Sequence, residues 1–324
     1  MNATRRAILA ALAAGPVTGP ALADRLDVSR AAVWKQVESL REAGFRIESG
    51  DDGYRVESVP AYGAAAIEFD LDAPYRIEYH EEIGSTNDRA RELAEAGEVG
   101  MAVVADEQTG GRGRLDREWT APSGGVWASL LLRPNRPPSA VPIYTLAAAV
   151  AVTRAAREAG ADARIKWPND VLVFDSRESA PETEISRDKL AGILTEMEGE
   201  ADRVSWLVVG IGVNANIDAE ALPSGATSLR AEVGDVDRRV FLQRVLEEFA
   251  SLTSEAGDLR NVLEAWRDHA ATLGQRVRVQ TPTETAEGEA IDVRFPGSLV
   301  IRTEGGERVV TAGDCEHLRP SGSE

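Results

Sequence analysis

The stretch 101-MAVVADEQTGGRGRLDR-117 is the feature from which the rest of the chain is interpreted. Its first half begins with an apolar run that predicts a strand, and a glycine- and arginine-rich segment follows at once. Glycines allow close approach to a ligand, and arginines supply fixed positive charge for phosphates. No Gly-Lys-Ser/Thr follows, so this is not a Walker loop. We interpret residues 108–117 as a ligand-binding loop; a basic surface turn is the alternative.

The overall charge makes this loop an exception. The net charge of the 324 residues is −18, and the only lysines are Lys35, Lys166 and Lys189. An acidic surface poor in lysine is typical of proteins that stay soluble at high salt, so the composition suggests a halophilic source. It also argues against non-specific nucleic-acid binding by the whole molecule. Residues 1–60 do not share this negative charge, because they contain eight Arg and Lys and eight Asp and Glu.

Composition also limits the compartment and the type of site. The single cysteine, Cys315, excludes an internal disulfide framework and a cysteine-clustered zinc site, and the three histidines show no metal-ligand spacing. No apolar run approaches the roughly 18 residues of a membrane helix. The twin arginine Arg5-Arg6 before an apolar stretch could belong to an export signal, but the stretch is short and continues into a helical pattern. We expect a cytoplasmic protein that does not associate with membranes.

The N-terminal region, 1–60, predicts a winged helix-turn-helix. Ser29 is expected to cap the third helix, whose apolar residues recur at helical spacing, and Gly44 to end it. A Gly-Asp-Asp-Gly segment then predicts a hairpin. The expected elements are helices at 4–14, 18–26 and 29–44 and extended runs at 45–47 and 54–56.

The short turn before the third helix would place that helix in a DNA major groove. Its outward residues would contact phosphates or bases, whereas a protein-interaction module is the alternative. The expected DNA-binding residues are Ser29, Arg30, Lys35 and Gln36.

The remainder predicts a mixed α/β domain over 64–268, preceded by a linker at 60–75, and a small C-terminal barrel over 272–321. In the central domain we expect strands at 76–83, 101–108, 125–133, 163–174, 189–200 and 206–216, and helices at 87–97, 144–159 and from 240 to 270. In the C-terminal domain we expect four strands, at 275–280, 288–295, 298–303 and 308–312.

Four further segments combine polar or glycine residues with these element ends. Residues 84–88 (GSTND) would cap a helix and offer free N–H groups to a polar ligand. Residues 166–170 (KWPND) place one of the three lysines in a polar and aromatic cluster, where it could stabilise a developing negative charge. Residues 189–194 (KLAGIL) and 209–214 (VGIGVN) carry glycines inside strands, typical of close approach by a ligand or another backbone. Taken singly, each could be purely structural.

In this order, the segments resemble the biotin protein ligases, and the type that is also a biotin-operon repressor matches best. The resemblance extends over nearly the whole chain: SRAAVWKQVESLREAGF at 29–45 resembles that family's recognition helix. GSTND, GGRGR, KWPND, KLAGIL and GIGVN follow its catalytic domain, and GRGR with KWPND is highly specific. The implied fold is α+β: the winged helix, a catalytic domain like those of lipoate ligases and class II aminoacyl-tRNA synthetases, and an SH3-like barrel.

The resemblance also implies residue roles. Lys166 would contact the biotin carboxylate and the α-phosphate, and together with Arg112 and Arg114 it would be catalytic. A loop with Arg114 would close over biotinyl-adenylate. The implied biotin-binding residues are Ser85, Thr86, Asn87, Gln108, Gly111, Arg112, Gly113, Arg114, Lys166, Gly210, Ile211 and Gly212. The implied nucleotide-binding residues are Arg114, Lys166, Asn169 and Asn214. Metal ligands are not identified.

The implied reaction converts biotin and MgATP to biotinyl-5′-AMP and pyrophosphate. A lysine of a biotin carboxyl carrier protein then takes the biotin. Operator DNA and a homodimer in the adenylate-bound state are the other implied partners. Two features depart from the family: Asp116 replaces a usual glycine, and the acidic insertion 175–188 is unusually long and has no assigned function.

Three alternatives stay open. A lipoate ligase would share the fold and the adenylate chemistry. A ligase with a vestigial DNA-binding domain would lack repression. A transcription factor with an inactive sensor domain would have no need of Lys166 and Arg112, which are both present.

Overall fold

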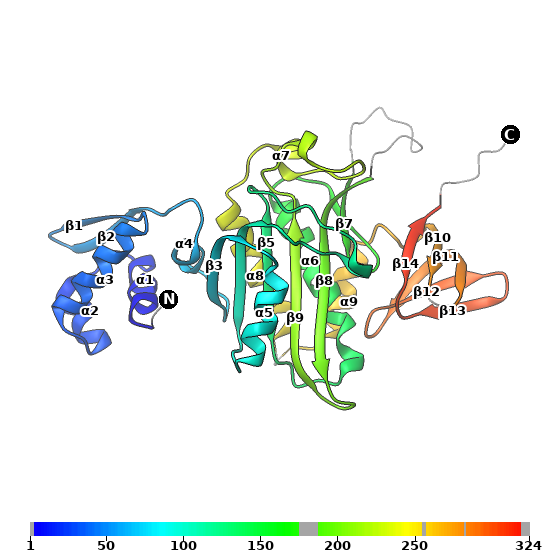
Figure 1. Ribbon diagram of the computed structural model, residues 1–324, viewed down its shortest axis with the longest axis horizontal. Helices are drawn as coiled ribbons and strands as arrows, with labels where there is room; N and C mark the ends of the chain where they lie inside the picture. Colours follow the sequence, from blue (N-terminus) through cyan, green and yellow to red (C-terminus); the bar gives the residue numbers. More distant parts are fainter. Residues whose placement is uncertain (1–2, 175–186, 255–256, 282, 319–324) are drawn as a thin grey trace.

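The structure, a computed structural model, describes residues 3–174, 187–254, 257–281 and 283–318. Three bodies follow one another along its long axis: a helical domain with a small hairpin, a large sheet covered by helices, and a small β domain (Figure 1). Of the predicted acidic insertion 175–188, residues 175–186 lie outside the described residues. The α+β fold with an N-terminal winged helix-turn-helix is confirmed.

The N-terminal body forms where helical spacing and caps predicted it. Ser29 Oγ accepts a hydrogen bond from the Ala32 amide at 3.1 Å and so starts the third helix. Apolar residues of the helices, among them Ile8, Leu22, Val33 and Val37, are buried together in a core of their own. The elements are α1 (Ala3–Ala13), α2 (Gly19–Leu26), α3 (Arg30–Glu42), β1 (Arg46–Gly50) and β2 (Gly53–Ser58).

The central body is a seven-stranded mixed sheet in the order β3-β4-β5-β9-β8-β7-β6, in which β3 and β4 alone pair in parallel. Its strands are β3 (Arg76–Ile83), β4 (Met101–Gln108), β5 (Val126–Leu132), β6 (Ala163–Lys166), β7 (Asp170–Phe174), β8 (Arg187–Gly199) and β9 (Val204–Val213). Its helices are α4 (Ala64–Glu68), α5 (Thr86–Glu95), α6 (Pro142–Glu158), α7 (Leu229–Val233), α8 (Arg238–Thr253) and α9 (Arg260–Asp268).

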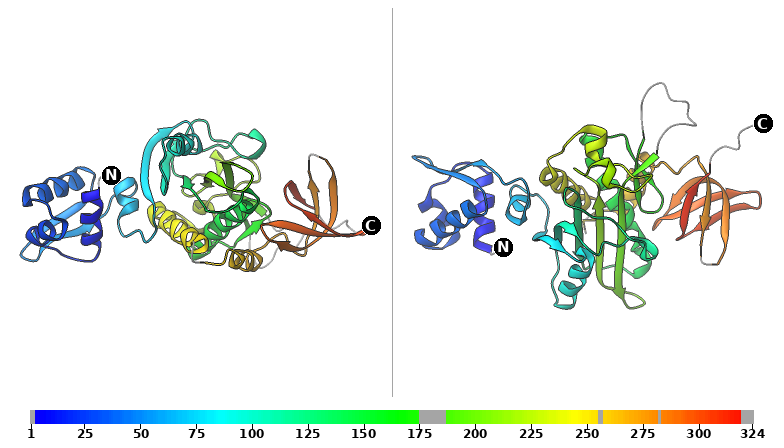
Figure 2. Two further views of the ribbon diagram at one scale, coloured as in Figure 1. Left: turned by 90° about the horizontal axis from the view of Figure 1, so that it is seen from below. Right: turned by 45° about the horizontal axis from the view of Figure 1, so that its top comes forward.

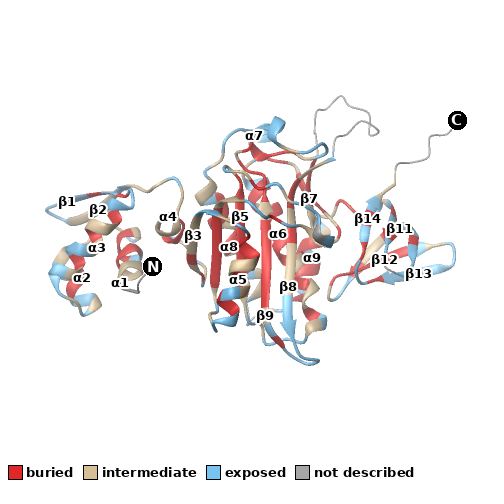
Figure 3. Ribbon diagram, viewed as in Figure 1, coloured by how far each residue is buried: buried red, intermediate tan, exposed pale blue. Residues whose placement is uncertain are grey.

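Alternation along the strands divides the core between the two faces of this sheet. In β4, Ala102 and Val104 point to the large cluster with α6, α8 and α9, whereas Met101 and Val103 point to α5. Figure 2 shows these helices on opposite sides of the sheet, and Figure 3 shows its strands as the most buried part of the molecule. The free face beside α5 is therefore the one on which a cavity can form.

Helix α6 differs from the expectation that no apolar segment approaches the length of a membrane helix. The segment Pro138–Glu158 has 21 residues with a mean hydropathy of 1.3, enough in length and composition to cross a membrane. However, 78% of its most apolar window is buried inside the fold, where it packs against α8, α9 and the sheet. It is the core helix of the central domain.

Two strand predictions are corrected. Residues 163–174 form two antiparallel strands, β6 and β7, rather than one, because Trp167-Pro168-Asn169 is a turn and proline offers no N–H for pairing. The C-terminal body has five strands rather than four, in the order β13-β12-β11-β10-β14. They are β10 (Arg276–Gln280), β11 (Thr285–Arg294), β12 (Ser298–Thr303), β13 (Gly306–Val310) and β14 (Asp314–His317). The SH3-like barrel stays a prediction.

Polar contacts join the three bodies. The Glu68 side chain of α4 is 3% exposed and takes hydrogen bonds from Arg6 of α1 (3.3 Å) and from the Ile77 amide at the sheet edge (2.8 Å). At the other end, Trp167 Nε1 donates to the Gly297 carbonyl at 2.8 Å, and the Trp167 amide donates to Thr272 Oγ1 at 2.9 Å. Buried carboxyl, hydroxyl and indole groups thus orient the outer domains on the sheet.

This C-terminal junction contains a histidine whose charge opposes folding. Burial lowers the pKa of His317 to about 4, and the charges of Lys166 and Arg187 act in the same direction. Its Nε2 lies 3.0 Å from Thr272 Oγ1, which also accepts a hydrogen bond from the Trp167 amide. The unfolded chain binds a proton below about pH 6.5 and the folded chain only near pH 4, so stability is lost as pH falls through this window.

We predict that His317→Gln removes this pH dependence. Between pH 7 and pH 4.5 the wild type should lose about 2 kcal/mol more of its unfolding free energy than the variant, since glutamine does not titrate. Urea unfolding of both proteins at the two pH values measures the difference. Equal losses would contradict the assignment.

Candidate active site

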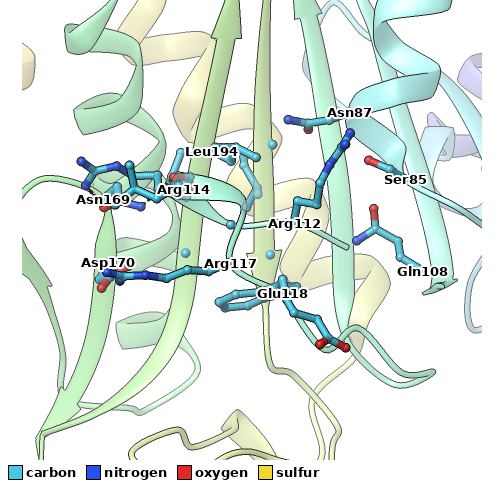
Figure 4. A pocket seen from close by; sticks show the side chains of 18 of the residues that line it. Ser85, Asn87, Gln108, Arg112, Arg114, Arg117, Glu118, Asn169, Asp170 and Leu194 are labelled. Atoms are coloured by element: carbon cyan, nitrogen blue, oxygen red, sulfur yellow. Dashed lines mark hydrogen bonds between the residues drawn. The ribbon is translucent and has the colours of Figure 1, made fainter. Parts of the chain in front are cut away.

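A cavity of about 280 Å³ lies on the open face of the central sheet, between the start of α5, strands β8 and β9, and the loop after β4. Hydroxyl and amide side chains line one end and charged side chains the other; Figure 4 shows Ser85, Asn87 and Gln108 on one side of Arg112, and Arg114, Asn169 and Asp170 on the other. Among the predicted site residues, the structure brings to this cavity Ser85, Thr86, Asn87, Gln108, Arg112, Gly113, Arg114, Asn169, Gly210, Ile211 and Gly212.

The neutral end is a connected hydrogen-bond network. Ser85 Oγ caps α5 through the Asp88 amide at 3.3 Å. Gln108 Oε1 accepts from both the amide (2.8 Å) and the hydroxyl (2.9 Å) of Thr86. Buried Ser129 of β5 donates to the hydroxyl of Thr86 (2.7 Å) or to Asn87 Oδ1 (2.6 Å). Interlocked side chains of this kind hold fixed donors and acceptors for a neutral polar ligand.

The floor of the cavity is bare backbone. A Cβ at Gly210 would lie 2.3 Å from Asn87 Oδ1, and one at Gly212 would lie 3.0 Å from Trp119 Nε1. A Cβ at Gly192 of β8 would lie 3.2 Å from the Trp119 ring. These glycines therefore leave room for the side chains that shape the cavity.

Lys189 dominates the charged end. Its Nζ lies 2.6 Å from Asp170 Oδ1 and 5.1 Å from the centre of the Trp119 ring. The Trp119 indole Nε1 is buried and has no hydrogen-bond partner. A cation fixed between a carboxylate and an aromatic face, beside an unused donor, suits an anionic ligand group.

The arginine-rich loop is attached to its surroundings at three points. Arg112 pairs with Asp88 of α5. Arg114 donates to Asn169 Oδ1 (2.9 Å) and to the Gly313 carbonyl of the C-terminal domain (2.8 Å). Arg117 pairs with Asp314 at 2.6 Å, and this hydrogen bond holds the pKa of that carboxyl below its usual value. The C-terminal domain thus helps to form the charged end.

Three predicted site residues lie elsewhere. Lys166 does not line the cavity; it ends β6 near the C-terminal domain. There its charge adds to the lowering of the His317 pKa by burial and of the Asp314 pKa by the Arg117 hydrogen bond, and it only partly offsets the burial that raises the pKa of Cys315. Asn214 is buried and holds a loop by donating to the Thr227 carbonyl at 2.9 Å. Gly111 does not line this cavity, and a Cβ there would be 2.4 Å from the Trp119 carbonyl oxygen.

Sequence reasoning missed several residues that line this cavity or fix its walls. Lys189 carried a usable signal, because it is one of only three lysines and precedes a strand glycine. Asp170 belongs to the 166–170 motif but was given no role of its own. The others had no local signature, since their partners come from distant segments: Trp119, Ser129, Glu196 and Asp314. Over the described ranges, no group of three or more His, Cys, Asp or Glu side chains could hold a metal ion.

The face predicted to bind DNA is partly corrected. Arg30 and Lys35 are exposed on α3, and Ser29 caps it. Gln36 does not point freely outward: it is half-buried, and its Oε1 accepts from Arg5 Nε of α1 at 3.1 Å. Trp34 is exposed instead.

Comparison with known proteins places this site in a family. Residues 79–214 match the Biotin/lipoate A/B protein ligase family, residues 4–63 an HTH domain, and residues 272–318 the Biotin protein ligase C terminal domain. The bifunctional ligase/repressor BirA of Bacillus subtilis is 36% identical over 315 residues, which cover 93% of each chain. This chain belongs to the biotin protein ligase family.

Two further similar proteins match a smaller share of this chain. The biotin--[acetyl-CoA-carboxylase] ligase of Paracoccus denitrificans is 35% identical over 241 residues, covering 71% of this chain and 95% of that one. The solved biotin protein ligase from Aquifex aeolicus in complex with biotin and ATP superposes with a TM-score of 0.62 at 28% identity, covering 75% of this chain and 99% of that one.

We predict that Gly210→Ala damages the neutral end of this biotin ligase's cavity. The added methyl must displace Asn87, which would break its hydrogen bonds with Ser129 and Glu196 and cost about 1–3 kcal/mol of stability. Gly84→Ala is the control, because a Cβ there meets nothing within 4 Å. Chemical denaturation should separate the two variants, and equal stabilities would disprove the packing argument.

Proposed function

We propose that the chain joins biotin to ATP, forming biotinyl-5′-AMP and pyrophosphate, and then transfers biotin to a lysine of a biotin carboxyl carrier protein or domain. The observation that carries this proposal is the two-ended cavity of a biotin protein ligase family member: neutral hydrogen-bonding groups around Thr86 and Gln108, and cations around Lys189. A neutral ring system with an acid tail fits these two ends better than a uniformly charged ligand.

The first step brings two negatively charged groups together. The biotin carboxylate attacks the α-phosphorus of ATP, the bond to the β-phosphate oxygen breaks, and pyrophosphate leaves with its magnesium ion. Lys189 would bind the carboxylate and the α-phosphate, reducing their repulsion and stabilising the charge of the transition state. Arg112, Arg114 and Arg117 would hold the phosphates, with Asn169 positioning Arg114. Lys166 as the phosphate contact is the alternative.

The second step transfers the acyl group. The uncharged amine of the carrier lysine attacks the carbonyl carbon of the mixed anhydride, and AMP leaves as an anion. The arginine loop would cover the adenylate until the carrier protein binds, because the guanidinium groups of the loop can all bind the adenylate phosphate. The basic test is to incubate the protein with biotin and labelled ATP and to look for bound biotinyl-adenylate. Adenylate formed with lipoate in preference to biotin would favour the lipoate alternative.

We predict that Lys189→Met lowers the rate of adenylate formation about a hundred- to thousandfold, because removing a fixed charge at a reacting centre typically costs that much. Lys166→Met is the matched control and should lose less than about tenfold, since Lys166 lies outside the cavity. Biotin-dependent pyrophosphate release measures both. A greater loss for Lys166→Met would return the role to that lysine.

We further propose that the protein is a biotin-responsive repressor of the cytoplasm. The winged helix supports this proposal, together with the 36% identical relative named as a ligase/repressor. A homodimer formed in the adenylate-bound state would present two recognition helices to a two-fold operator. A vestigial DNA-binding domain is the competing interpretation.

We predict that Arg30→Ala and Lys35→Ala each reduce the salt dependence of operator binding by about one unit per lost phosphate contact, without affecting ligation. Gln36→Ala should leave the slope unchanged, because glutamine is uncharged and its contacts release no counterion. Titrations against DNA upstream of the organism's biotin genes, with and without biotin and ATP, measure this. Absence of any sequence-specific complex would leave a ligase with a vestigial domain.

A further inference from the structure

One side chain on α3 is not explained by ligation or by phosphate contacts. Trp34 is 58% exposed, and it is the one exposed tryptophan of six, all of which lie within the described residues. The inner face of α3 is filled by Val33, Val37 and Leu40, which are fully buried. Trp34 therefore lies on the outer face for a reason other than the core of its own domain.

The surroundings of Trp34 are chemically specific. Arg30 lies one helical turn before it and Lys35 directly after it, and both are exposed. Exposed Ala31 adds a small apolar group beside Trp34 on the same face of the helix. The first turn of α3 has no acidic residue, and the first carboxylate, that of Glu38, is paired with Arg41. In a chain of 54 acidic residues, this is an apolar strip flanked by cations.

The position of the strip points to a nucleic-acid partner. Helices α2 and α3 lie at the outer end of the N-terminal domain, whereas α1 contacts α4 on the side of the acidic catalytic body (Figure 1). The N-terminal residues of a recognition helix are those that reach base edges in the major groove. The cations complement phosphates, and an apolar surface between them suits the thymine 5-methyl group, which is the apolar feature that distinguishes bases in the major groove.

We infer that Trp34 is a specificity-determining residue that reads thymine methyl groups in the operator. This inference rests on the proposed repressor function and adds the base that the helix selects. The contact is uncharged, so it should persist at salt concentrations that weaken the phosphate contacts of Arg30 and Lys35. For a protein with the composition of a high-salt environment, such a contact keeps sequence discrimination when electrostatic attraction is screened.

The test compares thymine with deoxyuridine, which differs only by that methyl. Duplexes that bind the full-length protein with biotin and ATP are first selected from a random-sequence library. Each thymine of the selected site is then replaced by deoxyuridine in turn. Wild-type affinity should fall about fourfold at one or more positions, since removing one buried methyl-sized group has about that effect.

Variants assign the effect to Trp34. Trp34→Ala should bind the thymine duplex at least about fourfold more weakly and lose the response to deoxyuridine, whereas Trp34→Phe should retain it. Arg30→Ala is the matched control, with a smaller salt slope and an unchanged thymine-to-deoxyuridine ratio. That ratio should also be constant from about 0.2 to about 2 M KCl.

The outcomes are separable. If no sequence is enriched, the repressor function fails and this inference fails with it. If sequences are enriched but no deoxyuridine substitution weakens wild-type binding, or Trp34→Ala still responds to it, the repressor stands and the inference is overturned. The inference is equally overturned if Trp34→Ala stays monomeric in sedimentation with biotin and ATP where the wild type dimerises, because Trp34 would then be a subunit contact.

Discussion

The catalytic domain depends on the absence of side chains at the middle of two neighbouring strands. Gly192 of β8 pairs directly with Gly212 of β9, and Gly210 lies opposite Leu194 in the same register. Trp119 and Asn87 pack directly onto this bare backbone. A side chain at any of the three glycines would collide with one of them. The Trp119 ring lies under the Lys189 ammonium group. The Asn87 amide is hydrogen-bonded to both Ser129 and Glu196. Both ends of the cavity are thus built on the same strip of backbone.

The charged side chains of the site gather at one end of the cavity. An excess of carboxylates over the molecule would repel anionic substrates, so cations must be held where they are needed. Asp88, Asp170 and Asp314 each pair with a cation of the site, Arg112, Lys189 and Arg117 respectively. The exposed pairs are individually weak, and a phosphate or carboxylate that enters can compete for the same cations. The site is therefore preorganised without being closed to its ligands.

The outer domains are attached by buried polar groups as well as by apolar contacts, such as those that join Val277 and Leu299 to the central core. Glu68 links α1 to the edge strand of the sheet, and Thr272 links Trp167 to His317. Such contacts are directional, so they fix orientation as well as proximity. The recognition helix is held away from the acidic body, and the C-terminal domain is held where Gly313 and Asp314 reach the arginine loop.

Local sequence determined the elements whose signals are local. Caps, helical spacing and alternation predicted α1 to α3, the hairpin and most of the central strands, and the order of short motifs predicted the family. The motif at 166–170 singled out Lys166, and no local pattern indicated which of Lys166 and Lys189 lines the cavity. Tertiary structure places them differently: Lys166 ends β6 near the C-terminal domain, whereas Lys189 of β8 lies 5.1 Å from the centre of the Trp119 ring. The same holds for Gln36, which Arg5 of another helix captures, and for β14, whose pairing with β10 joins segments about 35 residues apart. Contacts between distant segments depend on how the chain packs, and no local pattern records that packing.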